Sequence, residues 1–173
     1  MAKLEGKVAL ITGAAVGLGE GISTTYAKYG AKCVLAARGP KVLELAEQLR
    51  NEGYEATGVQ VDVSDYKSVE RIADRAQMDA AAAKGVEKFG EINVACCNAG
   101  VCRLAPFEEM TDEMRDFHID VNIKGVWNTC KAVVPYMLKQ GGGSIVIASS
   151  VTGDIVADAG EAAYATTKAA LVG

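Results

Sequence analysis

Residues 7–19 read KVALITGAAVGLG, and this stretch decides the fold. The continuous apolar run over residues 7–11 predicts a buried β-strand, and the residues after the glycines predict a helix. Gly13 fits a tight turn, Gly17 allows a ligand to approach the backbone, and Gly19 allows the helix to pack closely. A strand, a glycine turn and a helix in this order predict a site for nucleotide phosphates at the positive end of the helix dipole.

The rest of the chain alternates β-rich apolar runs with amphipathic stretches. Strands are expected at residues 7–11, 32–37, 58–61, 91–97 and 144–149, and helices at 17–29, 42–49, 66–88, 117–138 and 162–171. Strict alternation implies right-handed crossovers and a parallel sheet covered on both faces. We therefore predict one α/β domain over residues 1–173, a doubly wound Rossmann-type sheet in three αβα layers. The 66–88 helix is about two turns longer than a compact βαβ unit needs, which leaves an insertion or a locally incorrect sequence as open explanations.

Composition narrows the classes of function. The net charge is −4 without a basic block, which argues against nucleic acid as a partner. No apolar run reaches the ~18–20 residues that cross a bilayer, and the first residues lack the apolar core of a signal peptide, so a cytoplasmic protein is expected. The 5 cysteines are odd in number and scattered, as reduced packing thiols are, and His118 is the only histidine. A metal site and a Ser-His-Asp triad are therefore not expected.

Further motifs follow the glycine turn in a fixed order along the chain. They are Asn98-Ala99-Gly100, Asn122-x-x-Gly125, Ser150-x-x-Gly153 and Tyr164-x-x-x-Lys168. With Thr12-Gly13-x-x-x-Gly17-x-Gly19, they resemble the short-chain dehydrogenase/reductase family from Lys7 to the last residue. Residues 117–120, 122–128 and 149–154 narrow the resemblance to a bacterial subgroup of that family.

The resemblance implies a site for a nicotinamide dinucleotide. Its expected residues are Gly13, Gly17, Leu18, Gly19, Arg38, Asp62, Val63, Asn98, Ala99, Gly100, Tyr164 and Lys168. Ala37 stands where an NAD enzyme carries an acidic residue, and Arg38 follows directly, so NADP(H) is preferred and NAD(H) is the lesser candidate. The alternatives left open are that Arg38 is a solvated surface residue and that Asp62 caps the next helix.

Tyr164 and Lys168 are four residues apart on one helix and therefore share a face. A tyrosine hydroxyl is a weak acid, and an ammonium ~4 Å away at an effective dielectric near 20 stabilises the phenolate by about 4 kcal/mol. The resemblance implies that Tyr164 exchanges a proton with the substrate oxygen and that Lys168 also holds the nicotinamide ribose. It implies that Ser150, with Ser149 as its rival, hydrogen-bonds the carbonyl oxygen, and that Asn122 bends the long helix and holds a water.

The predicted function is an NADP(H)-dependent oxidoreductase that interconverts a small carbonyl compound and its alcohol. The alternatives are a non-catalytic nucleotide-binding module and an inactive fragment, because family members continue into two further strands and a substrate lid. Without them, the strand at 144–149 is expected to expose an edge that carries Ile145 and Ile147. A full-length protein is expected to form a homotetramer or homodimer through the 117–138 helix and the last helix.

Overall fold

The computed structural model of the chain describes residues 3–62 and 73–173. Over these residues, a five-stranded parallel sheet has the strand order β3-β2-β1-β4-β5. The strands are β1 (Val8–Thr12), β2 (Lys32–Ala37), β3 (Ala56–Gln60), β4 (Val94–Cys97) and β5 (Ser144–Ile147). The chain moves outward from β1 to β3 and then returns to the other side of β1. In such sheets ligands bind outside the carboxyl ends of the two strands at this switch point, here β1 and β4.

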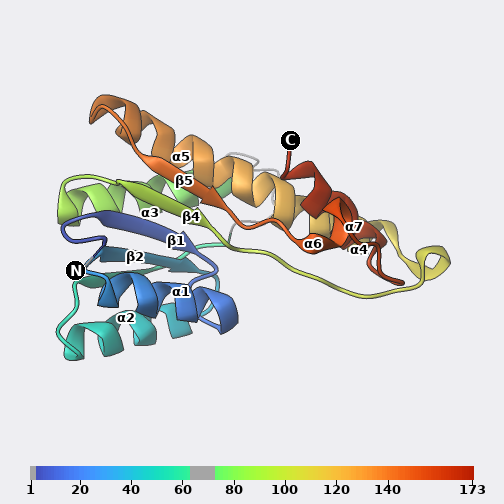
Figure 1. The fold of residues 1–173 in the computed structure, drawn as a ribbon, viewed down its shortest axis with the longest axis horizontal. Helices are drawn as coiled ribbons and strands as arrows, with labels where there is room; N and C mark the ends of the chain where they lie inside the picture. Colours follow the sequence, from blue (N-terminus) through green and yellow to red (C-terminus); the bar gives the residue numbers. More distant parts are fainter. Residues whose placement is uncertain (1–2, 63–72) are drawn as a thin grey trace.

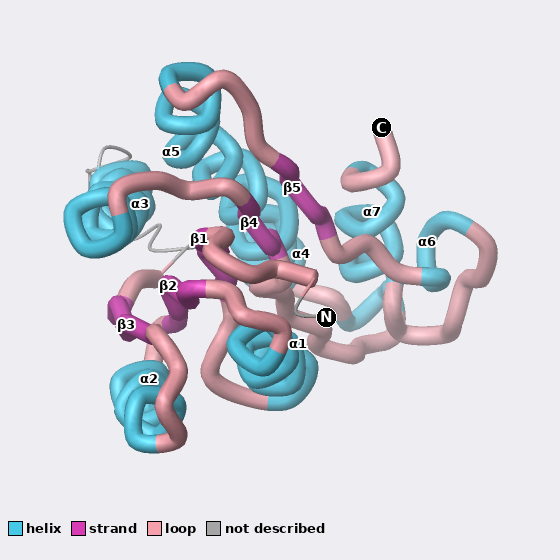
Figure 2. The backbone as a smooth tube through the Cα atoms, turned by 60° about the vertical axis from the view of Figure 1, so that its left-hand side comes forward, coloured by secondary structure: helices cyan, strands magenta, loops and turns pink. Residues whose placement is uncertain are grey.

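Helices cover both faces of the sheet (Figures 1 and 2). α1 (Gly17–Lys28) and α2 (Lys41–Asn51) lie on one face, and α3 (Ala73–Phe89) and α5 (Gly125–Lys139) lie on the other. Side chains alternate along each strand, so every strand contributes to both apolar layers. Leu35 of β2 packs in one layer with Val42 and Leu49 of α2, while Val34 packs in the other with Met78 of α3. The predicted three-layer αβα architecture is confirmed.

The predicted helix over residues 117–138 is helical throughout, but its first part winds as a π-helix around Asn122, the residue expected to bend it. The structure has α4 (Asp112–His118), then a π-helical segment η2 (Ile119–Lys124), then α5. The wider π turns carry Asn122 fully buried, with its amide hydrogen-bonded to the backbone of Val101. Because this contact comes from a segment 21 residues away, helical periodicity alone could not reveal it.

Smaller differences have local causes. β3 begins at Ala56, before the predicted residue 58, and a Cβ on Gly58 would lie 2.7 Å from the Val42 carbonyl oxygen, so the glycine lets α2 lie close to this strand. β4 begins only at Val94, and the Asn93 side chain before it accepts a hydrogen bond from the Val8 N–H at 2.8 Å. Residues 66–72 of the predicted long helix lie outside the described residues. The remaining elements are η1 (Phe107–Glu109), α6 (Val151–Asp154) and α7 (Ala162–Ala170).

β5 forms one edge of the sheet and pairs with β4. Ile147 is 40% exposed, as expected for an uncovered edge, whereas Ile145 is half-buried against the apolar layer under α5. In the described part of the chain, no helix is long and apolar enough to cross a membrane.

Candidate active site

The turn between β1 and α1 requires glycine, because its backbone adopts positive φ angles and packs closely on neighbouring backbone. Gly13 and Gly17 have φ angles of +63° and +57°, a region that glycine enters without steric cost. A Cβ on Gly13 would lie 2.9 Å from Cα of Ala99, and one on Gly19 would lie 1.9 Å from the Gly13 carbonyl oxygen. These contacts place the N-terminus of α1 against the turn, where its unpaired N–H groups can hold phosphates.

The end of β4 is tied to the end of β1. Asn98 donates through its side-chain amide to the carbonyl oxygens of Thr12 and Gly13 at 3.2 and 3.4 Å. The Thr12 hydroxyl oxygen accepts from the N–H groups of Asn98 and Ala99 at 3.1 and 3.2 Å. The tripeptide 98–100 is therefore part of the same rigid unit as the glycine turn.

A cleft of about 780 Å³ runs along the carboxyl ends of the strands. Ten of the predicted cofactor residues line it: Gly13, Leu18, Gly19, Arg38, Asp62, Asn98, Ala99, Gly100, Tyr164 and Lys168. Gly17, Asn122 and Ser150 are not among the lining residues, and Val63 lies outside the described residues. The cleft thus joins the glycine turn at one end to the Tyr164–Lys168 pair at the other.

Arg38 stands directly after β2, where the chain turns toward α2. Its side chain is 66% exposed and lines the cleft, and its guanidinium pairs with the carboxylate of Asp62 at 4.0 Å. Lys41, the first residue of α2, lines the same end of the cleft. The sequence analysis missed Lys41, although a second cation three residues after Arg38 was a signal for an anionic ligand group.

Lys168 is the most enclosed charged group of the site, with only 5% of its surface exposed. Its Nζ donates to the Ala148 carbonyl oxygen at 2.7 Å and lies 5.8 Å from the centre of the Tyr164 ring. Burial lowers the pKa of Lys168, because the ammonium is separated from water. A Cβ on Gly100 would lie 3.4 Å from this Nζ, so Gly100 leaves the lysine its space.

The two adjacent serines have different positions. Ser149 lines the cleft, and its hydroxyl donates to the Lys168 carbonyl oxygen at 2.8 Å. Ser150 caps α6, where its hydroxyl oxygen accepts from the Thr152 N–H at 3.2 Å. Because the Ser150 hydroxyl only accepts in this cap, its proton is available for donation to a ligand. Of the two serines, however, only Ser149 is a lining residue of the cleft.

Asn122 acts behind the cleft, through its neighbours. Its amide nitrogen donates to the Val101 carbonyl oxygen at 3.0 Å and to the Thr167 hydroxyl at 2.9 Å. Thr167 in turn donates to the Tyr164 carbonyl oxygen at 2.8 Å. Asn122 therefore connects η2 to α7, and Thr167 is a link in this chain that the sequence analysis missed.

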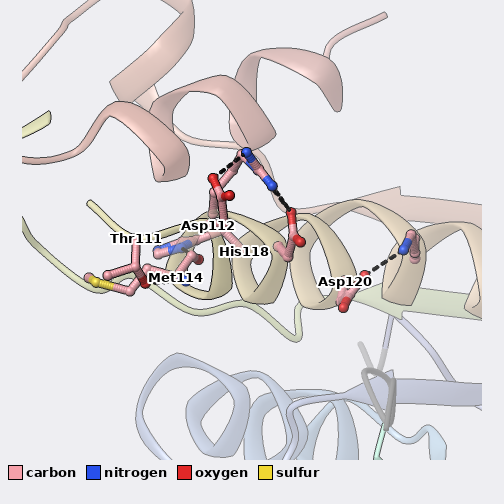
Figure 3. A network of polar contacts seen from close by, with 8 residues as sticks. Thr111, Asp112, Met114, His118 and Asp120 are labelled. Atoms are coloured by element: carbon pink, nitrogen blue, oxygen red, sulfur yellow. Dashed lines mark hydrogen bonds and ion pairs between the residues drawn. The ribbon is translucent and has the colours of Figure 1, made fainter. Parts of the chain in front are cut away.

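His118 is a packing residue of α4. It is fully buried, and its Nε2 accepts from the Arg103 N–H at 2.9 Å, so the ring proton lies on Nδ1 and is donated to the Met114 carbonyl oxygen at 2.7 Å. Figure 3 shows His118 on α4, near the exposed ion pair of Asp112 with Arg115 and the pair of the buried Asp120 with Lys124. Both ring nitrogens are used within the fold, which leaves the imidazole no role as a base.

The cysteines are reduced thiols, and Cys33 is fully buried, which raises its pKa to about 12. Over residues 3–62 and 73–173, no group of three or more His, Cys, Asp or Glu side chains is arranged to hold a metal ion.

The chain matches the family model described as short chain dehydrogenase over residues 7–173. It is 52% identical to the oxidoreductase UcpA of Escherichia coli (strain K12), over 100% of this chain and 62% of that protein. It is 43% identical to FabG of Thermotoga maritima, named a 3-oxoacyl-(acyl-carrier-protein) reductase, over 99% of this chain and 66% of that protein. It is 38% identical to D-threitol dehydrogenase of Mycolicibacterium smegmatis, over 99% of this chain and 62% of that protein.

The chain spans 62% of the length of UcpA and of the threitol dehydrogenase. The match covers the glycine turn, the tripeptide 98–100 and the Tyr164–Lys168 pair, which are the parts that the cleft brings together. With its family model matched over residues 7–173 and its parallel sheet in the order β3-β2-β1-β4-β5, this chain belongs to the short-chain dehydrogenase family.

Proposed function

We propose that the protein is an NADP(H)-dependent oxidoreductase that interconverts a carbonyl compound and its alcohol, with Tyr164 as the general acid and base. One observation carries this proposal: the same cleft has a phosphate-binding glycine turn at one end and the Tyr164–Lys168 pair at the other. A module that only binds a nucleotide needs no such pair. The names of two relatives, a 3-oxoacyl reductase and a D-threitol dehydrogenase, describe the two directions of this chemistry.

The residues present fit a dinucleotide. At Gly13 and Gly19 the backbone of the turn packs so closely on its neighbours that a side chain would collide with them. The N-terminus of the 12-residue α1 faces this turn, where its N–H groups can bind phosphates. When bound there, NADP(H) supplies the hydride to the carbonyl carbon or accepts it from the alcohol carbon.

Tyr164 gives a proton to the substrate oxygen in reduction and takes one from the alcohol in oxidation. Lys168 places an ammonium beside the phenol, with its Nζ 5.8 Å from the centre of the ring, and this positive charge favours the transfer of the proton from Tyr164. Each reduction therefore transfers one hydride to carbon and one proton to oxygen, and solvent restores the proton to Tyr164. The Ser150 hydroxyl stabilises the substrate oxygen by donating a hydrogen bond; its rival Ser149 could do so only by giving up its hydrogen bond to the Lys168 carbonyl oxygen.

The preference for NADP(H) rests on the residues after β2. Arg38 and Lys41 line the adenosine end of the cleft, and Ala37 leaves that end without the acidic residue that repels a 2′-phosphate. Asp62 pairs with Arg38 at 4.0 Å and orients the guanidinium, while its own side chain is 28% exposed.

A cytoplasmic location and a homo-oligomer are further parts of the proposal. The exposed face of α5 supports the oligomer, since Trp127 and Leu138 expose 66% and 76% of their surfaces. A small carbonyl or alcohol is the expected partner, and neither nucleic acid nor a membrane is.

Parallel fluorescence titrations with NADPH and NADH test the cofactor part of the proposal. Trp127 and the reduced cofactor provide the signals. Saturable binding that favours NADPH, followed by NADPH oxidation in the presence of small ketones and aldehydes, is the expected result. Binding without turnover would favour the non-catalytic module, and the absence of binding would contradict both.

A further inference from the structure

Behind Cys102, which lines the cleft, lies the carboxylate of Glu161, and one of its two oxygens has no hydrogen-bond partner among the described residues. Glu161 directly precedes α7, and positions 161, 164 and 168 recur at the spacing of one helix face. Glu161 therefore stands one turn before Tyr164. Glu161 is not itself a lining residue of the cleft, but Cys102, which its carboxylate contacts, is one. Over i and i+3, Cβ atoms are about 5–6 Å apart, so a small substrate at Tyr164 is within reach of this carboxylate.

Two segments meet at this point and hold the carboxylate in place. The Ala105 N–H donates to the Gly160 carbonyl oxygen at 3.1 Å, which ties the loop after β4 to the start of α7. Cys102, on the same loop, is exposed and lines the cleft. Its thiol donates to Oε1 of Glu161 at 3.9 Å, a long and weak hydrogen bond.

The other oxygen, Oε2 of Glu161, is buried and has no hydrogen-bond partner among the residues that the structure describes. Within the same residues no cation forms an ion pair with Glu161, and the nearby Arg103 is instead stacked over the Phe117 ring at 4.1 Å. A buried acceptor without a donor is costly, so the carboxylate as a whole is short of donors: Oε2 has none, and Oε1 has only the weak contact of the thiol. Burial raises the pKa of the Cys102 thiol, and the negative charge of Glu161 raises it further. The thiol therefore keeps its proton and acts as a neutral donor to Glu161, which a stronger donor can replace.

We propose that Glu161, with Cys102 in front of it, selects carbonyl substrates that carry a hydroxyl group close to the carbonyl. The inference rests on the function proposed above, because it places the substrate carbonyl at Tyr164. A substrate hydroxyl that displaces the exposed thiol makes a charge-assisted hydrogen bond to the carboxylate in place of the 3.9 Å contact. A substrate carboxylate at the same place meets a like charge, so keto acids are rejected.

The test uses three small probes of similar size: hydroxyacetone, butanone and pyruvate. Hydroxyacetone and butanone have the same number of heavy atoms and differ in a hydroxyl in place of a methyl group. Because the hydroxyl also activates the carbonyl, the decisive quantity is the change in the ratio of kcat/KM values between wild type and variants. Glu161→Met removes both carboxylate oxygens and nearly keeps the length of the side chain. Glu161→Gln keeps a hydrogen-bond acceptor but removes the charge. Glu87→Gln, at an exposed position on α3, is the control.

In Glu161→Met we expect the hydroxyacetone-to-butanone ratio to fall roughly ten- to hundredfold, as for the loss of a hydrogen bond to a charged group. Glu161→Gln keeps part of the preference, and both variants gain on pyruvate. The control leaves all three values unchanged. An unchanged ratio in Glu161→Met, or an equal loss on hydroxyacetone and butanone, overturns the inference.

A second readout does not depend on turnover. Ligand-observed NMR compares the binding of hydroxyacetone and butanone to the chain saturated with NADP⁺, which cannot reduce either ketone. Preferential binding of hydroxyacetone by wild type and its loss in Glu161→Met support the inference. A chain that binds NADP⁺ but shows no such preference overturns the inference alone, whereas a chain that binds neither NADP⁺ nor NADPH overturns the proposed function.

Discussion

The Nζ atom of Lys168 lies 5.8 Å from the centre of the Tyr164 ring, one helical turn away on α7. Its hydrogen bond of 2.7 Å to the Ala148 carbonyl oxygen fixes it at the end of β5. The ammonium is thereby held beside the phenol by the sheet as well as by the helix. This arrangement places a positive charge beside the phenol, as the proposed proton transfer by Tyr164 requires.

Lys168→Met should abolish turnover without unfolding the protein. The variant loses one hydrogen bond, worth about 1 kcal/mol, but it also removes the cost of burying an ammonium, which lowers the pKa of Lys168. We expect kcat to fall roughly 10²–10⁴-fold and the melting temperature to change by a few degrees only. Steady-state kinetics and thermal unfolding check both, with the exposed Lys131→Met on α5 as control. A fall in kcat of less than tenfold would speak against the role of Lys168.

Arg38→Ala should separate the two cofactors. The Arg38 side chain is 66% exposed and its ion pair with Asp62 spans 4.0 Å, so its removal costs little stability. We expect the Kd for NADPH to rise roughly ten- to hundredfold and the Kd for NADH to stay within about threefold. Arg115→Ala, which removes surface ion pairs on α4, is the matched control. Equal losses for the two cofactors would exclude Arg38 as the ligand of the 2′-phosphate.

Gly19→Ala should disrupt the phosphate turn. Its Cβ would lie 1.9 Å from the carbonyl oxygen and 2.7 Å from the carbonyl carbon of Gly13, and both are backbone atoms that only a shift of the turn can relieve. We expect a loss of about 1–3 kcal/mol of stability and of most NADPH affinity.

Gly21→Ala is the matched control on the same helix, since nothing lies within 4 Å of its Cβ. It should keep NADPH affinity and raise the free energy of unfolding by about 0.5–1 kcal/mol, because alanine is the better helix former. Denaturant unfolding and NADPH titration of both variants measure these effects. Equal affinities for the two variants would contradict the assignment of the turn.

Cys33 should make stability fall at alkaline pH. Burial raises its pKa from 9.0 to about 12, so the folded protein holds the thiol proton that the unfolded chain releases above pH 9. The associated stability is fully present below the unfolded pKa and is lost as the pH rises toward the folded pKa. In Cys33→Ala the decline of the unfolding free energy between about pH 9 and 11 should be shallower, by up to about 1.4 kcal/mol per pH unit. Parallel profiles for wild type and variant would show that Cys33 does not contribute.

The layered fold could be predicted because its signals are local. Residues 32–37 form β2 with the predicted bounds, because the apolar run that predicts the strand is complete in the sequence. The family resemblance placed a bend of the long helix at Asn122, but the π-helical turns between α4 and α5 have no signal in the helical periodicity, and the contact of Asn122 with Val101 exists only in the folded chain.

The candidate site also combines features that the sequence could predict with features that it could not. The glycine turn and the Tyr164–Lys168 pair have fixed spacings, and the structure places them in one cleft. Cys102 and Glu161 are 59 residues apart and have no motif, so only the meeting of the two loops reveals them as neighbours. Ser149 rather than Ser150 lines the cleft, a distinction that depends on the backbone turn into α6 and not on the residue type.

The proton transfer by Tyr164 is the central claim, and turnover by Tyr164→Phe tests it most directly. The variant keeps the ring beside Lys168 and removes only the hydroxyl, while Tyr29→Phe at the end of α1 is the matched control. We predict that Tyr164→Phe binds NADPH with wild-type affinity and that its kcat for ketone reduction falls roughly 10²–10⁴-fold, whereas the control is unaffected. A Tyr164→Phe variant that binds NADPH and reduces the ketone at a near-normal rate would contradict the account.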